Sequence, residues 1–230
     1  MPVVYTVSPD KPHALAVQRI ADELMRGALA LLPTETVYGV GVAIAPLCEG
    51  NPATAPMPSE GSGYRRIFSL KQRDLAQTVP WLVGGPDALD MYGSQVDERA
   101  RVLADEFWPG ALTIVVRASD NVPAFLRKSD GTVALRASAS AVVRALIART
   151  DSPLAVTSAN THGMPAPVSF AMAESRIVAG VDVAVDAGET PCRDASTIVS
   201  FESGSLEVVR EGALKRERIV AALAAHGMEC

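Results

Sequence analysis

The sequence has few cysteines, few aromatic residues and no excess of basic charge. Its three cysteines, Cys48, Cys192 and Cys230, are widely spaced and odd in number, which excludes a disulfide framework and a CxxC metal knuckle. We therefore expect free thiols. Because 21 Lys and Arg stand against 26 Asp and Glu, the formal net charge is -5, and the whole chain offers no basic footprint for nucleic acid or anionic lipid. Any anionic ligand must be held by local groups.

Several functional signatures are also missing from the sequence. No apolar run approaches the roughly 20 residues that span a bilayer, and the first residues lack the pattern of a secretory signal, so we expect a cytoplasmic protein without a membrane contact. There is no GxxxxGK[ST] loop, no GxGxxG fingerprint and no GxSxG elbow. His13, His162 and His226 are too far apart to indicate a zinc site. We predict no protein-held metal.

The apolar pattern alternates between strand-like and helix-like segments. Strand-like runs lie at 2–8, 28–32, 79–83, 111–117, 132–136, 154–157, 181–185, 197–201 and 206–209. Helical spacing occurs at 10–26, around Ile67 to Leu70, and at 95–107, 140–149, 171–178 and 215–225. Because some strands follow one another directly and others are separated by helices, the sequence predicts an α/β fold of the α+β type, with helices packed against a mixed sheet.

The chain shows no internal repeat and no interdomain linker. Proline and glycine crowd the segment 46–63, which predicts a long loop. A C-terminal helix is expected at 215–227, ended by Gly227. We interpret residues 1–230 as one domain.

Polar clusters follow or flank several of the apolar strands, where open sheets often present ligand-binding groups. The clusters contain Thr34-Glu35-Thr36 with Tyr38, Lys71-Gln72-Arg73, Arg136, Ser158-Ala159-Asn160, Ser196-Thr197 and Arg210. Two cations two positions apart would share a face on extended backbone and diverge on a helix.

Each cluster also has a structural interpretation. Thr34 and Thr36 are common turn and cap residues, and a Ser-x-Asn sequence is a common N-cap or turn. Taken alone, Lys71 and Arg73 are more typical of a solvated surface pair. A guanidinium beside an apolar strand needs an anionic partner, which for Arg136 or Arg210 is either a substrate or a structural carboxylate.

The ordered set of motifs is more specific than any one of them. The segments LPTETVYGVG, IFSLKQR, FWPGALTIVV, TVALRAS, AVTSAN, DAG, STIV and VVREGAL occur in this order from about Ala14 to Leu214. This set resembles the YrdC family, the threonylcarbamoyl-adenylate synthases of transfer RNA modification. The resemblance implies a twisted mixed sheet of the YrdC-like, dihydroxybutanone-phosphate-synthase-like kind, with a large positively lined cavity.

The resemblance also implies a nucleotidyltransferase activity. Such an enzyme joins L-threonine, bicarbonate and ATP into threonylcarbamoyl-AMP and releases pyrophosphate. Magnesium held by the phosphates is the implied cofactor, and the unstable product passes to a downstream tRNA threonylcarbamoyl transferase, with at most a weak tRNA contact.

Site roles follow from the resemblance position by position. Lys71 and Arg73 match a Lys-x-Arg motif that contacts the ATP phosphates and serves catalysis. The other ATP-side positions are Thr132, Ser158, Asn160 and Arg210, and the threonine-side positions are Thr34, Tyr38, Arg136 and Ser196. A guanidinium can bind a carboxylate through two parallel hydrogen bonds, which suits Arg136 to the amino acid.

The chain departs from the family pattern at four positions near the substrates. Asp74 follows the Lys-x-Arg motif where proline is usual, and Gly84 replaces a common histidine. Ser138 and Glu211 also stand where the family has proline. The loop at 46–63 is longer than the usual turn.

Two other functions are compatible with parts of the pattern. One is carbamoyl transfer through a carbamoyl-adenylate, although the proteins that carry it have extra modules for which 230 residues leave no room. The other is a non-catalytic RNA-binding module. Net charge -5 and 5% aromatic residues count against that module, because single-strand binders combine basic grooves with stacking rings.

Overall fold

The computed structural model describes residues 1–48 and 50–230, so that Glu49, which falls in the loop expected at 46–63, lies outside the described residues. Within them, ten strands form one mixed sheet in the order β1-β8-β2-β3-β7-β4-β6-β5-β9-β10. The strands are β1 (Val3–Thr6), β2 (Ala30–Pro33), β3 (Tyr38–Ala43), β4 (Trp81–Leu82), β5 (Leu112–Arg117), β6 (Thr132–Arg136), β7 (Leu154–Ser158), β8 (Val183–Asp186), β9 (Thr197–Ser200) and β10 (Glu207–Arg210).

Seven α-helices and four short 3-10 helices accompany this sheet in the described part of the chain. The α-helices are α1 (Ala14–Met25), α2 (Gly63–Lys71), α3 (Ala88–Tyr92), α4 (Glu98–Phe107), α5 (Ala141–Thr150), α6 (Ser175–Gly180) and α7 (Arg216–Ala225). The 3-10 helices are η1 (Ala45–Leu47), η2 (Pro52–Thr54), η3 (Ala124–Leu126) and η4 (Phe170–Met172). The helix expected at 171–178 is therefore two short pieces, η4 and α6.

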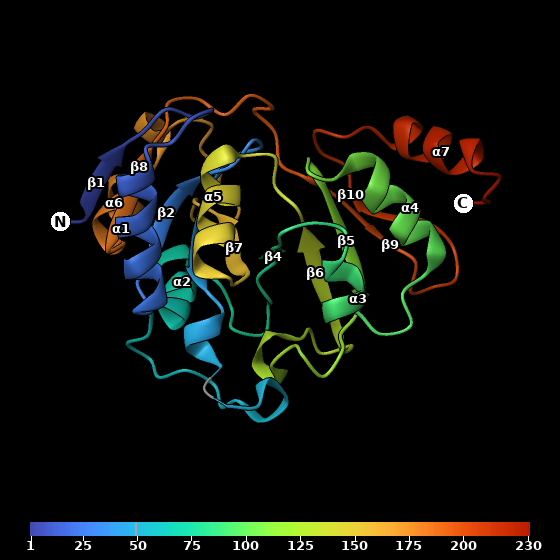
Figure 1. Ribbon diagram of the computed structural model, residues 1–230, viewed down its shortest axis with the longest axis horizontal. Coiled ribbons are helices and arrows are strands. Elements are labelled where there is room, and N and C mark those ends of the chain that lie inside the picture. The colour runs from blue at the N-terminus through green and yellow to red at the C-terminus, as the bar shows by residue number, and fades with distance from the viewer. Residues whose placement is uncertain (49) are drawn as a thin grey trace.

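Parallel and antiparallel pairs both occur in the sheet, as the mixed pattern predicted. β8 runs parallel to β1 and β2, β4 parallel to β6, and β5 parallel to β9. β3 pairs antiparallel with β2 and β7, and β10 pairs antiparallel with β9. Figure 1 shows β1, β8, β2, β3 and β7 in one half, β6, β5, β9 and β10 in the other, and β4 between them.

Strand β3 is absent from the sequence prediction because Gly39 and Gly41 interrupt its apolar run. Glycine normally weakens a strand, but it also allows close approach of another backbone. A Cβ atom on Gly41 would lie 2.4 Å from the carbonyl oxygen of Ala155 on β7. The close approach of the β7 backbone therefore explains why β3 contains glycine.

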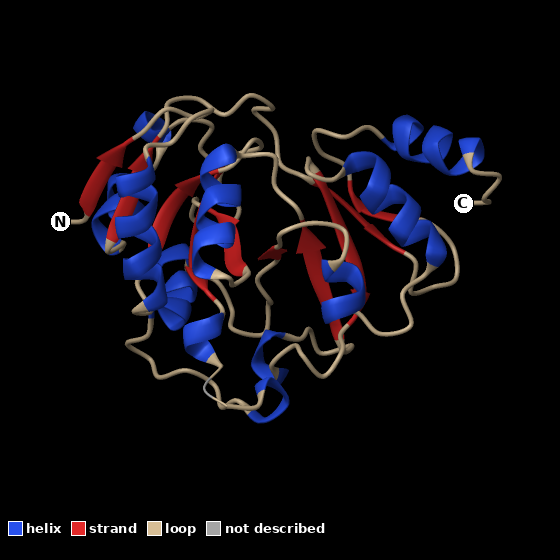
Figure 2. Ribbon diagram, in the orientation of Figure 1, coloured by secondary structure: helices blue, strands red, loops and turns tan. Residues whose placement is uncertain are grey.

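The helices cover the two faces of the sheet unequally. On one face, α1 and α5 lie side by side and bury residues such as Ile20 and Leu146 against β2, β7 and β8. Helices α2, α3, α4, α6 and α7 contribute to the larger core on the other face. In Figures 1 and 2, α1 and α5 cover only the half of the sheet that contains β2 and β7. In the part of the chain that the structure describes, the same face of β5, β6 and β9 lines a cavity and has no covering helix.

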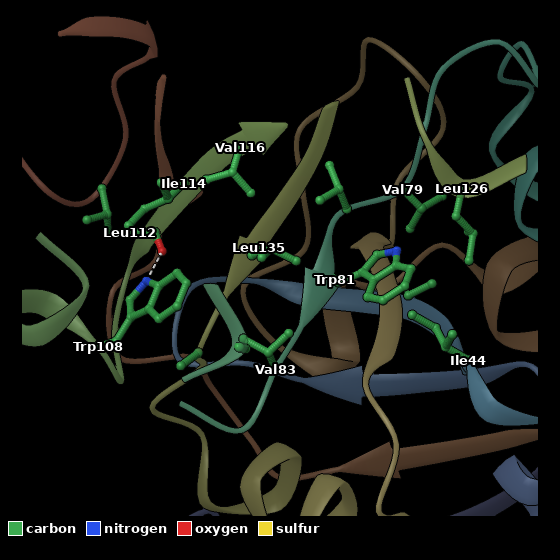
Figure 3. Packing of buried hydrophobic residues seen from close by; sticks show 14 of the residues in the cluster. Ile44, Val79, Trp81, Val83, Trp108, Leu112, Ile114, Val116, Leu126 and Leu135 are labelled. Atoms are coloured by element: carbon green, nitrogen blue, oxygen red, sulfur yellow. Dashed lines mark hydrogen bonds between the residues drawn. The ribbon is translucent and has the colours of Figure 1, made fainter. Parts of the chain in front are cut away.

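Period-two alternation divides the residues of β5 between the core and this uncovered face. Leu112, Ile114 and Val116 belong to the larger core, and the residues between them line a cavity. Figure 3 shows this core between Trp81 and Trp108, where the Trp108 indole N–H donates to the carbonyl of Leu112 at 2.6 Å. The core thereby fixes the direction in which the alternate side chains point.

Two further expectations can be compared with the structure. The three cysteines are free thiols, as predicted. No helix in the described ranges combines the length and apolar character required of a membrane span.

Candidate active site

A cavity of about 930 Å³ occupies the uncovered face of the sheet. Strands from both halves of the sheet and the C-terminal end of α2 supply its walls. It contains nine of the ten residues assigned from the sequence: Thr34, Lys71, Arg73, Thr132, Arg136, Ser158, Asn160, Ser196 and Arg210. Folding therefore brings together residues that are as far apart in the chain as Thr34 and Arg210.

Lys71 is the last residue of α2, and Gln72 caps the helix in the left-handed conformation at φ 52°. This bend turns the chain so that Lys71 and Arg73 both reach the cavity. The backbone between them is therefore neither an extended strand nor a continuing helix. The Lys71 ammonium donates to the carbonyls of Ser158 and Asn160, the latter at 2.8 Å. The side chain is 2% exposed.

Burial of this ammonium has an electrostatic consequence. Desolvation first, and the charge of Arg73 second, lower the pKa of Lys71 to about 8, while Glu174 opposes the shift. Two backbone carbonyls compensate the lost hydration only in part. Lys71 is still mostly cationic at pH 7 and ready to accept an anionic partner.

Arg73 lies next to Lys71 and is held by neutral acceptors. Its guanidinium donates to the Thr157 hydroxyl at 3.1 Å and to the Thr78 carbonyl at 2.7 Å. Its Nε is buried and has no hydrogen-bond partner among residues 1–48 and 50–230. Burial lowers the pKa of Arg73 from its ordinary value, yet an arginine remains charged.

Arg210 approaches the cavity from the edge strand β10. Its guanidinium donates to the carbonyl of Ser196 at 2.6 Å and to the Ser196 hydroxyl at 3.3 Å. That hydroxyl also pairs with Thr113 at 2.8 Å. Desolvation, followed by the nearby charge of Arg136, lowers the pKa of Arg210. Arg210 and Arg136 are therefore close enough to repel each other.

Arg136 already has an internal carboxylate partner. Its Nη2 donates to Glu35 Oε1 at 2.5 Å and to the Thr36 hydroxyl at 2.9 Å, while its Nε donates to the carbonyl of Gly110 at 3.1 Å. The sequence left open whether the partner of Arg136 is a substrate or a structural carboxylate. The structure shows a structural carboxylate, although Arg136 also lines the cavity. Any substrate carboxylate must share this guanidinium with Glu35.

The charged side chains that line the cavity favour the binding of anions. In residues 1–48 and 50–230, the salt bridges include Arg136 with Glu35 but none to Lys71, Arg73 or Arg210. Lys71, which is buried, Arg73, which is half-buried, and Arg210, which is exposed, thus face one cavity without a carboxylate partner in the described chain. Because buried charges are costly unless paired, this arrangement favours a polyanionic ligand.

The threonine at position 34 is both a turn residue and a cavity residue. Its hydroxyl donates to the carbonyl of Val37 at 2.6 Å and accepts the N–H groups of Thr36 and Val37, each at 3.1 Å. Thr132 similarly uses its hydroxyl locally, by donating to Asp130 at 2.6 Å. The Thr132 hydroxyl retains acceptor capacity toward the cavity, whereas the proton and both lone pairs of the Thr34 hydroxyl are used by these local bonds.

Ser158 and Asn160 supply the acceptors that hold Lys71, mainly through their backbone. The Asn160 side-chain oxygen lies 3.3 Å from the same ammonium, and its amide nitrogen donates to the carbonyls of Thr161 and Met164. The Ser-x-Asn segment is therefore a shaped loop around Lys71 rather than a helix cap.

Tyr38 does not lie among the cavity-lining residues. Its ring is fully buried, and its hydroxyl donates to the carbonyl of Gly188 at 2.9 Å and accepts the N–H of Ala187 at 3.0 Å. The side chain therefore lies outside the cavity wall, and its contact with threonine stays a prediction. Alternation along β3 explains the difference, because Gly39 faces the cavity and Tyr38 faces the core.

The four departures from the family pattern lie outside the centre of the cavity. Asp74 is exposed and accepts the N–H of Ala76, so it does not oppose the phosphate-side cations directly. Gly84 is at the surface. Ser138 is buried and donates to Glu35. Glu211 accepts the N–H of Arg216 at the start of α7.

Several cavity residues were missed by the sequence reasoning. They include Thr113, Arg117, Lys128 and Asp130. A threonine and an arginine at alternate positions of the otherwise apolar β5 are the signal that could have indicated its cavity face. Lys128 and Asp130 lie in a loop and carry no such periodic signal.

The chain is similar to proteins of one known family. The Sua5/YciO/YrdC family model, described as telomere recombination, matches residues 48–212. A threonylcarbamoyl-AMP synthase of Pyrococcus abyssi is 30% identical over 202 residues, which cover 87% of this chain and 55% of that protein. One from Vibrio cholerae is 31% identical over 201 residues and covers 85% of this chain and 97% of that protein.

Two solved structures have the same arrangement of elements. P. abyssi Sua5 complexed with L-threonine has a TM-score of 0.83 and 27% identity over 96% of this chain, which spans 61% of that one. Escherichia coli YciO has a TM-score of 0.77 over 92% of this chain and 96% of its own, and at 21% identity it supports the fold alone. The chain belongs to the Sua5/YciO/YrdC family.

Proposed function

We propose that this protein is a threonylcarbamoyl-AMP synthase. The observation that carries the proposal is the convergence of Lys71, Arg73 and Arg210 on one cavity without carboxylate partners in the described chain. A triphosphate supplies the missing negative charge. The names of the P. abyssi and V. cholerae relatives support the same activity.

ATP binds with its phosphates against the C-terminal end of α2 and the loop that follows β7. Lys71 and Arg73 neutralise the phosphate oxygens, and the Ser158–Asn160 loop holds the Lys71 ammonium in place. Each charge-assisted contact contributes about 1.5–3 kcal/mol. This site replaces the glycine-rich phosphate loop, which the sequence lacks.

L-Threonine binds beside the phosphates, near Arg136 and Arg210. The relative from P. abyssi was solved with L-threonine, which supports an amino-acid site in this fold. Arg136 is oriented by Glu35 and by the Gly110 carbonyl, and Arg210 by Ser196. The Thr113–Ser196 hydroxyl pair offers a partner for the threonine hydroxyl, and Thr34 lies in the same cavity.

The reaction requires no protein nucleophile. The amine of threonine combines with carbon dioxide from bicarbonate to give an N-carboxylate and loses a proton. An oxygen of this carboxylate attacks the α-phosphorus of ATP, the bond to the β-phosphate oxygen breaks, and pyrophosphate leaves with the electron pair. Negative charge develops on phosphate oxygens, where Lys71, Arg73 and Arg210 stabilise it.

Magnesium enters this scheme as part of the ATP substrate. No group of three or more His, Cys, Asp or Glu residues suited to a metal ion occurs in the described part of the chain. Magnesium commonly keeps several waters and is held by substrate phosphates, which fits a cavity lined by cations and hydroxyls. The protein's residues then bind the phosphates rather than the ion.

The product is a mixed anhydride and is readily hydrolysed. A downstream tRNA threonylcarbamoyl transferase consumes it, so we place the protein in tRNA modification in the cytoplasm. With a net charge of -5, tRNA contact with this chain is weak.

The proposal is tested with purified protein, ATP, magnesium and bicarbonate, with and without L-threonine. Release of pyrophosphate and formation of an AMP-linked product are followed together. We expect both to depend on threonine. Turnover with another amino acid instead, or no turnover under any condition, contradicts the proposal.

A further inference from the structure

The ATP-side residues come from two segments that are far apart in the sequence. Lys71 ends α2, whereas Ser158 and Asn160 lie at and beyond the end of β7. We propose that Arg176 and Glu174 are positioning residues which hold these two segments in the register that the ATP site requires. This inference rests on the proposed function, because it concerns the nucleotide half of the same site.

Arg176 bridges the two segments directly. One nitrogen of its guanidinium donates to the carbonyl of Leu70, the residue before Lys71. The other donates to the hydroxyl of Thr161, the residue after Asn160, at 2.6 Å. A single planar group thus joins the neighbours of both phosphate-side motifs. The fixed fork of an arginine constrains the distance between them more tightly than a lysine can.

Glu174 holds the other side of Thr161. Its two carboxylate oxygens accept the N–H and the hydroxyl of Thr161, each at 2.7 Å. It also lies 3.5 Å from Arg176 as a salt bridge. Because Thr161 accepts from Arg176 and donates to Glu174, the loop is fixed in position and in rotation.

The geometry of Lys71 depends on this register. Its ammonium donates to carbonyls of the Ser158–Asn160 segment, and the N–H of His162 donates to the Lys71 carbonyl at 2.9 Å. A shift of α2 against the loop therefore moves the ammonium away from its acceptors and from the phosphate position. Displacements of about 1 Å cost a large part of the activity of an oriented site.

Neither positioning residue is among those that line the cavity, and neither belongs to the core. Their side chains are 42% and 38% exposed for Arg176 and Glu174. Exposed ion pairs contribute little to global stability. Loss of either side chain should leave the fold intact, so an effect on ATP binding would report position rather than unfolding.

The test compares Arg176→Gln, Arg176→Lys and Glu174→Gln with the control Arg26→Gln. Arg26 forms a comparable exposed pair with Glu23 beside α1. We expect Arg176→Gln to raise the KM for ATP about tenfold while the KM for threonine stays within about twofold, as follows from the loss of one charge-assisted link. Arg176→Lys should recover part of the ATP affinity, and Arg26→Gln should behave as wild type.

The results separate this inference from the proposed function. If the wild type shows threonine-dependent turnover and Arg176→Gln has the wild-type KM for ATP, the positioning role is wrong and the proposed function stands. An equal loss for both substrates, accompanied by a fall in melting temperature, also overturns the positioning role. If the wild type shows no threonine-dependent turnover, the proposed function is wrong. Calorimetric titration with ATP then tests the positioning role by itself. A tenfold weaker affinity in Arg176→Gln supports the positioning role, and equal affinity or no ATP binding by the wild type overturns it.

Discussion

The guanidinium of Arg136 donates to the carboxylate of Glu35 at 2.5 Å, and both side chains are 8% exposed. The second oxygen of that carboxylate accepts the hydroxyl of Ser138. Ser138 stands where the family resemblance leads one to expect proline, and proline has no hydroxyl to donate. This chain thus has an additional hydrogen bond to the acid that orients Arg136.

Removal of one partner from this ion pair should destabilise the protein strongly. We expect Arg136→Met to lower the free energy of unfolding by about 3–5 kcal/mol, because Glu35 is then left buried and uncompensated. The double variant Glu35→Gln and Arg136→Met should lose less than the sum of the two single variants. Urea denaturation of the four proteins measures the coupling, and strictly additive losses would contradict a direct pair.

ATP affinity should decrease at alkaline pH. Burial and Arg73 lower the pKa of Lys71 to about 8, so its ammonium is charged at pH 7 and loses its proton as the pH rises through 8. If only the cationic form binds phosphate, the Kd for ATP rises by up to about tenfold for each pH unit above that pKa. Calorimetric titrations between pH 6.5 and 9.5 check this. Lys71→Arg serves as control, since its guanidinium does not titrate in this range.

Each cation of the Lys-x-Arg motif should contribute separately to turnover. We expect Lys71→Ala and Arg73→Ala each to lower kcat/KM for ATP by about ten- to a hundredfold, which corresponds to the loss of about 1.5–3 kcal/mol of charge-assisted contact. Lys215→Ala, which removes an exposed lysine paired with Glu211, is the matched control. Wild-type rates in both motif variants would show that the phosphates bind elsewhere.

Strand β3 should not tolerate a side chain at Gly41. A Cβ there would lie 2.4 Å from the backbone oxygen of Ala155, which cannot move without disturbing β7. Gly41→Ala should therefore destabilise the protein by about 1–3 kcal/mol in chemical denaturation. Gly61→Ala is the control, because nothing lies within 4 Å of a Cβ at that position. Equal stability of the two variants would refute the close strand approach.

The Tyr38 hydroxyl should matter for stability and not for threonine. Tyr38→Phe leaves the N–H of Ala187 and the carbonyl of Gly188 without this partner, so we expect a loss of about 1–3 kcal/mol in the free energy of unfolding. The KM for threonine should remain within about twofold of wild type. A large rise in that KM without loss of stability would return Tyr38 to the substrate site.

The local pattern of apolar residues was enough to predict the fold class and the order of most elements. Period-two runs indicated β5 and β6, and helical spacing indicated α1, α4 and α5, because burial on one face imposes these periods locally. Strand β3 escaped this reasoning because its glycines reflect contact with β7, which is a long-range relation.

Of the ten site residues that the motifs predicted, nine line the cavity, since their types suit anion binding and their order matches a family. The contacts that each of these residues makes depend on the three-dimensional fold. It paired Arg136 with Glu35, turned Tyr38 into the core, and left Lys71, Arg73 and Arg210 without a carboxylate partner in the described chain. These outcomes depend on which distant side chains meet, and a local pattern specifies a residue's face but not its neighbour across the sheet.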